Sequence, residues 1–296
     1  MSIRGPARTA VVGIAVVAVL GGSVAPGQSA DPLRVLQLNL CDSGMAGCHT
    51  GRAVAVAAEV VRTELPDVVT LNEVCRDGVD TLARTLDAHR DGRVVWAFQP
   101  ALNRRTGTPF RCLGSGQPFG NGIIVRLPAG QDYRTYGGTH PSQDARDSED
   151  RAWVCVAAVD GPLACTTHLA NTSVDVALAQ CGHLVDTVIP SVRADRLGVV
   201  LAGDFNLPPG GLASCLPRGY RHVSDDGLQE VVVSGDITLG PRRLIDLAGA
   251  TDHPGLLVSL VALPALRGVA VMPGRPTTNS TVDGIRTGAR TGRTKG

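Results

Sequence analysis

The sequence predicts an α/β fold of one domain, with mixed strand order rather than a strict strand–helix–strand array. Short apolar runs typical of strands alternate with helical stretches between residues 31 and 263. Hydrophobic residues make up 43% of the 296 positions and charged residues 19%, which is the composition of a globular chain. Because no repeat or linker divides this region, we predict one domain over residues 31–263.

The expected elements follow one another along this domain. Helices are predicted at 52–65, 77–89 and 173 to about 189, and strands at 34–40, 67–71, 93–98, 122–127, 197–203, 228–234 and 254–261, with a strand hairpin at 151–169. Pro66 stops the first helix, because proline cannot continue a helical hydrogen-bond ladder. Ser173 can cap the third helix, and Asp175 lies in its first turn, where a negative charge is favourable.

The two ends of the chain differ from the domain. Two arginines precede an apolar run from about Thr9 to Leu20, and a Gly/Ser/Ala/Pro stretch follows. That run is shorter than the roughly 20 residues of a spanning helix, so we predict a secretory signal peptide over residues 1–30, with an uncleaved membrane anchor as the alternative. Residues 264–296 are rich in Pro, Gly, Thr and Arg and predict a disordered tail. We therefore expect a secreted monomer whose mature chain has no membrane span.

The charge distribution restricts the binding partners. Residues 31–263 carry 20 basic and 26 acidic residues, a net charge of −6. A nucleic-acid-binding protein usually presents a basic footprint, which this region lacks, although a bound divalent metal can supply positive charge locally. Aromatic residues are only 3%, so a face of stacked aromatics is not expected.

Eight cysteines behind an export signal predict disulfides. They contain no CxxC spacing, which argues against a zinc site. In the 151–169 hairpin, a three-residue loop ending at Gly161 in the left-handed conformation places Cys155 opposite Cys165. Cys41 and Cys48 bracket one short loop, and the remainder pair most simply as Cys75–Cys112 and Cys181–Cys215.

Several predicted strands end in acidic, amide or imidazole residues. The runs LQLNL, VVTLNE, LACTTHL and VVLAGDFN share this pattern, and Asp252-His253 opens the last strand. Buried polar groups without partners cost about 1–3 kcal/mol each, so several of them at one sheet edge indicate a functional site. Carboxylate and amide oxygens suit Mg²⁺ or Mn²⁺, and imidazoles can stabilise or protonate phosphate oxygens.

The ordered set LQLNL, LNE, GNGIIV, TTHL, GDFNL and TDHPGLLV resembles the endonuclease/exonuclease/phosphatase superfamily. This superfamily includes DNase I-like nucleases, abasic-site endonucleases, neutral sphingomyelinases and inositol-phosphate 5-phosphatases. The match spans about 33 to 261. It implies a four-layered sandwich, in which two mixed β-sheets pack face to face with helices outside and the site lies at one end.

The resemblance also implies a role for each matching position. Glu73 matches the metal-binding glutamate, and Asn39 matches the asparagine that supports metal and phosphate. Asp204 matches the aspartate that orients or deprotonates the attacking water, and Asn206 matches its phosphate-binding partner. Taken singly, such residues could be turn, cap or core residues, and GDFN could be only a tight turn.

Four further positions complete the set. His168 and His253 match the two histidines around the scissile phosphate, and Asp252 matches the aspartate near the metal. Arg151 is a weaker candidate for substrate binding. The other five histidines lack such a context and are interpreted as surface or structural residues.

Two positions depart from the family pattern. The family's aspartate that pairs with the final histidine corresponds to Gln229, about 23 residues before Asp252. A glutamine can hydrogen-bond an imidazole but cannot stabilise an imidazolium by charge. If Gln229 faces His253, Gln229→Asp should raise activity or move its pH optimum upward. In addition, Cys41 stands two residues after Asn39, where the family carries an aspartate.

These observations predict a secreted, metal-dependent phosphoester hydrolase that uses Mg²⁺ or Mn²⁺. A phosphodiesterase acting on nucleic acid is the first hypothesis. The alternatives are a sphingomyelinase-like enzyme acting on a phospholipid, an inositol-phosphate-directed hydrolase, and a secreted binding module in which Gln229 has impaired catalysis.

Overall fold

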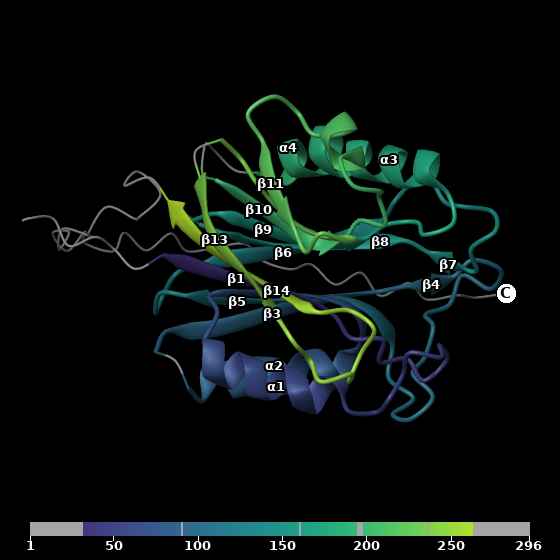
Figure 1. Cartoon of the computed structure of the whole chain (residues 1–296), viewed down its shortest axis with the longest axis horizontal. Helices are drawn as coiled ribbons and strands as arrows, with labels where there is room; N and C mark the ends of the chain where they lie inside the picture. Colours follow the sequence, from purple (N-terminus) through teal and green to yellow (C-terminus); the bar gives the residue numbers. More distant parts are fainter. Residues whose placement is uncertain (1–31, 90, 160, 194–197, 236, 263–296) are drawn as a thin grey trace, which may run out of the picture. The chain divides into compact units, whose positions relative to one another are not determined.

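The computed structural model describes residues 32–262, apart from residues 90, 160, 194–197 and 236. The predicted signal peptide and the predicted tail therefore lie outside the described residues. Within the described domain, two six-stranded sheets pack face to face, and helices cover the outer face of each (Figure 1). The predicted four-layered α/β sandwich is confirmed.

The first sheet has the strand order β13-β14-β1-β2-β5-β3. Its strands are β1 (Leu33–Asn39), β2 (Val68–Cys75), β3 (Arg93–Pro100), β5 (Phe119–Leu127), β13 (Ile237–Ile245) and β14 (Gly255–Ala262). Only β1 and β2 are parallel neighbours, and helix α1 (Ala53–Glu64) makes the crossover between them. Helix α2 (Arg76–Asp87) lies beside α1 on the outer face (Figure 1).

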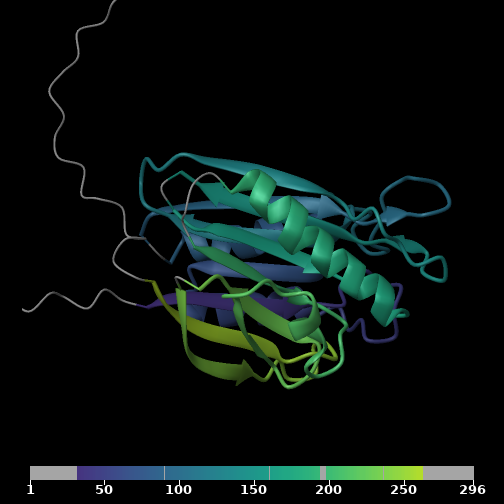
Figure 2. The same ribbon diagram turned by 90° about the horizontal axis from the view of Figure 1, so that it is seen from above.

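The second sheet has the order β11-β12-β10-β9-β8-β6. Its strands are β6 (Tyr133–Thr139), β8 (Ala152–Ala158), β9 (Leu163–His168), β10 (Val199–Asp204), β11 (Arg221–Ser224) and β12 (Gln229–Val233). Its parallel pair is β9 and β10, joined by a long helix on the outer face (Figure 2). That helix consists of α3 (Val174–Gly182), a π-helical segment η1 (His183–Val188) and α4 (Ile189–Val192). Ser173 caps it as predicted, accepting a hydrogen bond from the Val176 amide.

Three smaller elements complete the domain: β4 (Leu102–Asn103), which pairs with β7 (Glu149–Asp150), and the 3-10 turn η2 (Gly211–Ser214). Strands β6, β11 and β13 were not predicted. All three are at sheet edges, where one side is solvated and the apolar pattern is weak, as in YRTYGGT of β6. No helix among the described residues has the length and apolar character needed to cross a membrane.

Aliphatic side chains fill the space between the layers. Alternate residues of one strand point to opposite faces, so Val35 of β1 packs between the sheets while Leu36 packs under the helices. In the second sheet, Val200 of β10 likewise packs between the sheets, and Leu201 packs under the helix on the outer face. Strands buried on both faces read as continuous apolar runs, which is why the sequence locates the central strands well.

All eight cysteines form the four predicted pairs, Cys41–Cys48, Cys75–Cys112, Cys155–Cys165 and Cys181–Cys215. Cys155 and Cys165 are register partners in β8 and β9, as the hairpin predicted. The predicted left-handed conformation of Gly161 is wrong, since its φ is not positive. Its amide instead donates to the Ala158 carbonyl at 3.3 Å, which closes the turn and preserves the register.

Candidate active site

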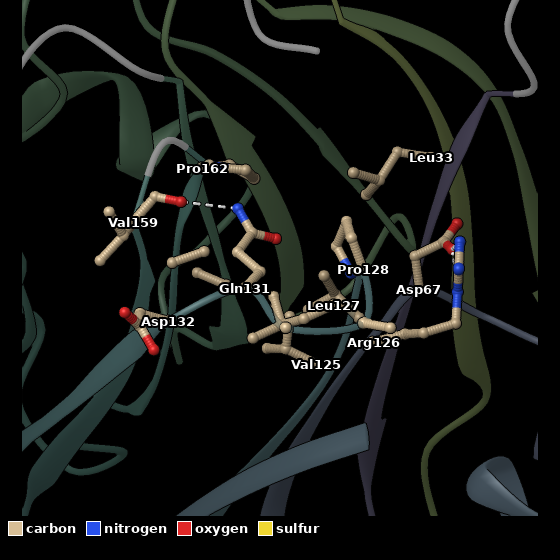
Figure 3. A pocket seen from close by; sticks show the side chains of 16 residues that line it. Leu33, Asp67, Val125, Arg126, Leu127, Pro128, Gln131, Asp132, Val159 and Pro162 are labelled. Atoms are coloured by element: carbon tan, nitrogen blue, oxygen red, sulfur yellow. Dashed lines mark hydrogen bonds and ion pairs between the residues drawn. The ribbon is translucent and has the colours of Figure 1, made fainter. Parts of the chain in front are cut away.

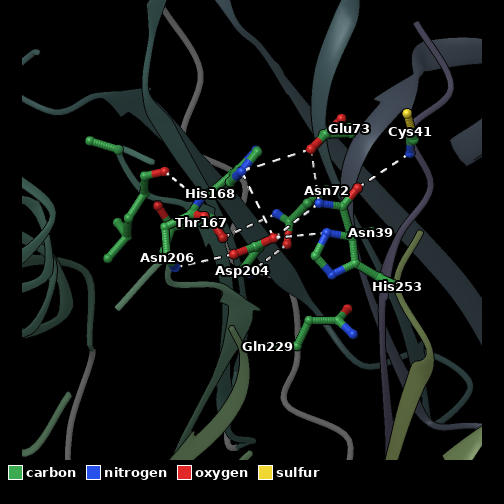
Figure 4. A network of polar contacts seen from close by, with 12 residues as sticks. Asn39, Cys41, Asn72, Glu73, Thr167, His168, Asp204, Asn206, Gln229 and His253 are labelled. Carbon is green, nitrogen blue, oxygen red and sulfur yellow. Dashed lines mark hydrogen bonds and ion pairs between the residues drawn. The ribbon is translucent and has the colours of Figure 1, made fainter. Parts of the chain in front are cut away.

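The polar residues predicted from strand ends meet at one end of the sandwich (Figure 4). In the first sheet, Asn39 at the end of β1 is the register partner of Asn72 in β2. In the second sheet, Asp204 of β10 lies between His168 of β9 and Gln229 of β12 in register. Register partners project to the same face of a sheet, so these five residues form two facing polar rows at the carboxyl ends of the parallel strands.

Glu73 reaches the site because β2 is irregular at this point. In a regular strand Asn72 and Glu73 would point to opposite faces. The pairing of β2 with β5 shifts between Leu71 and Val74, which is a bulge, and Glu73 adopts a left-handed φ of 52°. Bulges re-aim side chains, and positive φ in a non-glycine residue is strained backbone that is common at functional sites.

Asn39 holds the two central carboxylates together. Its Nδ2 donates to Glu73 Oε1 at 2.9 Å and to Asp204 Oδ2 at 3.0 Å. Its Oδ1 accepts the Cys41 amide at 3.2 Å, which fixes the orientation of the Asn39 amide. Cys41 also has a left-handed φ, of 45°, and is tied to Cys48. The disulfide loop therefore supports the residue that links Glu73 to Asp204.

The two histidines face these carboxylates from opposite sides. His168 Nε2 is 3.9 Å from Glu73 Oε1 and 4.0 Å from Asp204 Oδ2. His253 Nε2 is 3.7 Å from Asp204 Oδ2 and 3.8 Å from Asp252 Oδ1. Burial, together with the charges of neighbouring groups, holds the pKa of His168 well below its usual value, so this imidazole is neutral at pH 7.

Asn206 follows Asp204 and also has a left-handed φ, of 50°. Its amide N–H donates to Asp204 Oδ1 at 3.1 Å, and its side-chain Nδ2 donates to the Leu169 carbonyl at 2.9 Å. Asn206 therefore joins the end of β10 to the end of β9, next to His168. It lies where the sequence predicted it, beside the aspartate.

Arg151 is buried beside the site at the start of β8, with its side chain 4% exposed. Its Nε donates to Asp147 Oδ2 at 2.9 Å, and its Nη1 is 3.8 Å from Glu149 Oε1. Nη1 is buried and has no hydrogen-bond acceptor among the described residues. A buried guanidinium nitrogen without an acceptor is costly, so it is a natural donor to an anionic ligand.

The acidic cluster fits a hard divalent cation. Burial raises the pKa of Glu73, and the charges of Asp204 and Asp252 raise it further. Burial likewise raises the pKa of Asp204. A cation at this place would relieve both effects. Mg²⁺ commonly binds one or two carboxylates and keeps several waters, and the carboxylates of this cluster are of that kind. Asp252 also lies close to the sulfur atoms of Cys41 and Cys48, which are joined in a disulfide.

Gln229 does not have the partner that the sequence suggested. The expectation that its side chain faces His253 as a charge-deficient substitute for aspartate is not supported. Its Nε2 donates to the Pro254 carbonyl at 2.6 Å and to Asp225 Oδ2 at 3.1 Å. Gln229→Asp would therefore bring a carboxylate against these two acceptors, and this substitution is not expected to raise activity.

The buried amides behind the site were not among the residues predicted from the sequence. Gln37 Nε2 donates to Asn72 Oδ1 at 2.8 Å and lies 3.3 Å from Gln229 Oε1. Asn72 Oδ1 also accepts the Asp204 amide at 2.7 Å, which connects the two sheets. The available signal was a polar residue inside an apolar run, as in LQLNL. Asp225, outside any such run, gave no signal.

A cavity lies at the other end of the sandwich and is not a comparable site. It has a volume of about 490 Å³ and is lined at the start of β1 and β2 by Leu33 and Val68 (Figure 3). Asp67, Arg126 and Asp132 are its charged residues, and the first two are paired with each other. Most of its lining is aliphatic, and no histidine is among its lining residues.

The sequence profile of the Endonuclease/Exonuclease/phosphatase family matches residues 50–290. The chain belongs to this family. Members of the family are hydrolases that act on phosphoesters, and the acidic and imidazole cluster lies within the matched part except for Asn39. Comparison with curated proteins found no significant match.

Solved structures of the family share the fold. An endonuclease/exonuclease/phosphatase from Beutenbergia cavernae is 20% identical, with a TM-score of 0.58 over 78% of this chain and 72% of that one. The human Nocturnin catalytic domain with bound sulfate is 14% identical, with a TM-score of 0.59 over 79% and 94%. D. rerio TDP2 complexed with a single-strand DNA product is 15% identical, with a TM-score of 0.56 over 77% and 98%.

Proposed function

We propose that this protein is a secreted, metal-dependent phosphodiesterase whose substrate is a nucleic acid. The observation that carries the proposal is the bridge from Asn39 to both Glu73 and Asp204, with His168 and His253 within 4.0 Å of the carboxylates. This is a concentrated acid, amide and imidazole cluster on strand ends, where structural stability gives no reason for one.

Glu73 and Asp252 would hold a Mg²⁺ or Mn²⁺ ion, helped by Asn39, whose Nδ2 positions the Glu73 carboxylate. The ion would supply positive charge to the phosphate oxygens as negative charge grows on them. Asp204 would orient the attacking water and accept its proton, because it is fixed through its backbone amide by Asn72 and through Oδ2 by Asn39.

The two histidines would act on the phosphate itself. The neutral His168 ring can donate one hydrogen bond to a non-bridging oxygen without carrying a charge. His253, on the opposite side of Asp204, would hold another oxygen and assist the leaving group. Asn206 would keep the ends of β9 and β10 in register so that His168 and Asp204 stay adjacent.

Arg151 would bind the substrate phosphate. Its Nη1 is buried without an acceptor among the described residues, while its Nε is anchored on Asp147. An anchored guanidinium with one unused donor is preorganised for a phosphate oxygen. Arg151→Lys keeps the positive charge but loses the planar set of guanidinium donors. It should therefore raise KM more than it lowers kcat.

Nucleic acid is preferred over phospholipid on two grounds. The described domain exposes few large apolar side chains, such as Leu113, Val174 and Leu244, and these give a lipid surface little to hold. A family relative, TDP2, binds a single-strand DNA product. The net charge of −6 over residues 31–263 opposes tight DNA binding, so we expect weak, metal-assisted binding with a high KM.

Secretion is proposed from two features of the chain. The first 30 residues have the composition of a signal peptide, and all eight cysteines are disulfide-bonded. Disulfides persist in oxidising compartments and are rare in the cytosol. Expression with the native leader, followed by N-terminal sequencing of protein from the medium, tests this proposal. We expect released protein that lacks the leader; protein that stays with the cell and keeps its leader would support the membrane anchor.

A substrate panel tests the reaction class. Plasmid DNA, single-stranded DNA, RNA, sphingomyelin vesicles and inositol phosphates are each incubated with the protein in Mg²⁺ and in excess chelator. We expect cleavage of nucleic acid in Mg²⁺ and none in chelator. Hydrolysis of sphingomyelin or inositol phosphates alone would replace the proposed substrate, and no hydrolysis of any member in Mg²⁺ or Mn²⁺ would favour the binding module.

A further inference from the structure

We propose that Gln229 and Asp225 together position His253, a task for which the family pattern uses a single aspartate. We call these two residues the Asp225–Gln229 pair. The proposal rests on the proposed function, in which His253 contacts the phosphate. Neither member touches the reacting atoms, so both are positioning residues. The pair acts through the backbone of Pro254, the residue that follows His253.

Every polar atom of the Gln229 side chain is used. Nε2 donates one hydrogen to the Pro254 carbonyl at 2.6 Å and the other to Asp225 Oδ2 at 3.1 Å. Oε1 accepts from Gln37 Nε2 at 3.3 Å. The side chain is fully buried, so these bonds have no competition from water. The amide therefore has one orientation, with its nitrogen toward Pro254.

Asp225 fixes that orientation from the other side. Its Oδ1 accepts the backbone amides of Gly227 at 2.8 Å and of Gln229 at 3.1 Å, so the carboxylate is built into the turn before β12. Its Oδ2 can only accept, which compels the Gln229 nitrogen to face it. The family pattern has the negatively charged side chain at the position of Gln229. In this chain the charge is instead on Asp225, which contacts Gln229.

The loop that carries His253 is held at both of its ends. Thr251 Oγ1 donates to the Asn39 carbonyl at 3.0 Å, and the Pro254 carbonyl accepts from Gln229. His253 lies between these two attachments, with Nε2 3.7 Å from Asp204 Oδ2. Proline cannot donate a backbone hydrogen bond, so its carbonyl is the polar backbone group by which this position can be fixed.

The Gln229 amide also reaches the other half of the site. Gln37, its partner, donates to Asn72 Oδ1, and the same oxygen accepts the Asp204 amide. Asn72 Oδ1 accepts from both Asp204 and Gln37, and Gln37 Nε2 donates to both Asn72 and Gln229, so one connected network of amides contacts the backbone of Asp204 and the backbone next to His253. A carboxylate at position 229 would break it, because Asp225 Oδ2, the Pro254 carbonyl and the carboxylate are all acceptors.

The test uses two variants. Gln229→Glu keeps the length and shape of the side chain but replaces the donating amide nitrogen by a carboxylate oxygen, and Asp225→Asn places an amide nitrogen where an acceptor faced the Gln229 nitrogen. We measure kcat and KM at pH 8 on the nucleic acid that the wild type cleaves. We expect kcat to fall at least about tenfold in Gln229→Glu and less in Asp225→Asn, with KM within about twofold, since a misplaced group at the reacting centre lowers kcat.

The imidazole NMR signal of His253 supplies a readout that needs no turnover. In metal-free protein, we expect Gln229→Glu to shift or broaden this signal while the His89 signal, on an exposed ring, is unchanged. Gln131→Glu is the matched control: Gln131 Nε2 also donates to a backbone carbonyl at 2.6 Å, that of Val159, at the other end of the sandwich. It should change neither kcat nor the His253 signal.

The double variant Asp225→Asn/Gln229→Glu separates positioning from folding. The asparagine amide introduced by Asp225→Asn can donate to the new carboxylate, so thermal stability should recover, but the Pro254 carbonyl still lacks its donor and kcat should stay low. Recovery of kcat together with stability would overturn the proposal, as would an unchanged His253 signal in folded Gln229→Glu. If the wild type cleaves no substrate, the proposed function fails, while the NMR comparison still decides the positioning role.

Discussion

Asn39 and Asp204, at the ends of strands in opposite sheets, are joined by a hydrogen bond of 3.0 Å. The same Asn39 nitrogen donates to Glu73 at 2.9 Å, so one amide holds two carboxylates of raised pKa close together. Their mutual repulsion and burial are tolerated because Asn39 supplies hydrogen bonds to both. This relationship leads to the first prediction.

Asn39→Ala should weaken metal binding more than it weakens the fold. Without the amide, the Glu73 and Asp204 carboxylates lose their shared donor and their relative position. Loss of a group that orients metal ligands typically costs about 10–100-fold in affinity. Titration calorimetry with Mg²⁺ on wild type and variant measures this. Glu59→Gln, on the exposed face of α1, is the control, and an Asn39→Ala affinity equal to the control would contradict the bridging role.

Metal affinity should depend on pH in a direction set by the same carboxylates. A metal binds the deprotonated forms, and the pKa values of Glu73 and Asp204 are raised. As pH falls, these groups therefore take up protons earlier than ordinary carboxylates would, and affinity is lost from a higher pH. The rise in melting temperature caused by Mg²⁺ should be largest at neutral or higher pH and shrink toward pH 5. A rise that is constant from pH 5 to 8 would count against these residues as ligands.

His140 should make the fold sensitive to acid. Burial and the neighbouring His183 lower its pKa to about 3. Its ring Nδ1 is hydrogen-bonded to Nδ1 of His183, and its Nε2 is hydrogen-bonded to Oγ1 of Thr167. The unfolded state takes up a proton near pH 6.5, so the stability due to neutral His140 is complete above that pH and declines toward pH 3.

Replacing this histidine should flatten the pH dependence. His140→Gln can keep both hydrogen bonds and has no proton to gain. Between pH 6 and 4, its free energy of unfolding should fall less steeply than the wild type's, by up to about 1.4 kcal/mol per pH unit. Urea denaturation at several pH values measures the two slopes. His89→Gln, on an exposed ring, should keep the wild-type slope, and equal slopes for all three proteins would show that His140 is not the sensitive group.

The Cys41–Cys48 bridge should matter more for activity than for stability. The Cys41–Cys48 bridge spans a sequence separation of 7 and lies next to Asn39. The Cys181–Cys215 bridge spans a sequence separation of 34 and does not adjoin the site residues. Chain entropy predicts about 2.5 kcal/mol for the first bridge and about 3.8 kcal/mol for the second. Replacing each pair by alanines should therefore give opposite rankings: the second loses more stability, and the first loses more activity. The same ranking in melting temperature and kcat would contradict the support of Asn39 by its loop.

The central strands and the site residues on them could be predicted because local sequence determines them. Apolar runs buried on both faces define β1, β2, β9 and β10, and a polar residue ending such a run has little other reason to be there. Edge strands such as β13, with the sequence ITLGPRRLI, could not be predicted, because half of each residue's environment is solvent. Their pairing is decided by the neighbouring strand.

The partner of Gln229 could not be predicted for a different reason. Its place on β12 follows from the sequence, but its side-chain partners come from a turn and from a loop 25 residues along the chain. The bulge that turns Glu73 into the site likewise depends on pairing with β5, which the run VVTLNE does not reveal. Such details arise from tertiary contacts, which override local pattern.

Plasmid cleavage by wild type and Asp204→Asn, each in Mg²⁺ and in excess chelator, tests the proposed chemistry most directly. Asp204→Asn can keep the acceptor toward Asn39 but cannot accept a proton from water, so it should fold with a wild-type circular dichroism spectrum and cleave at least about 100-fold more slowly. The wild type should cleave only in Mg²⁺. Equal cleavage by the two proteins, or full wild-type cleavage in chelator, would contradict metal-dependent hydrolysis at this site.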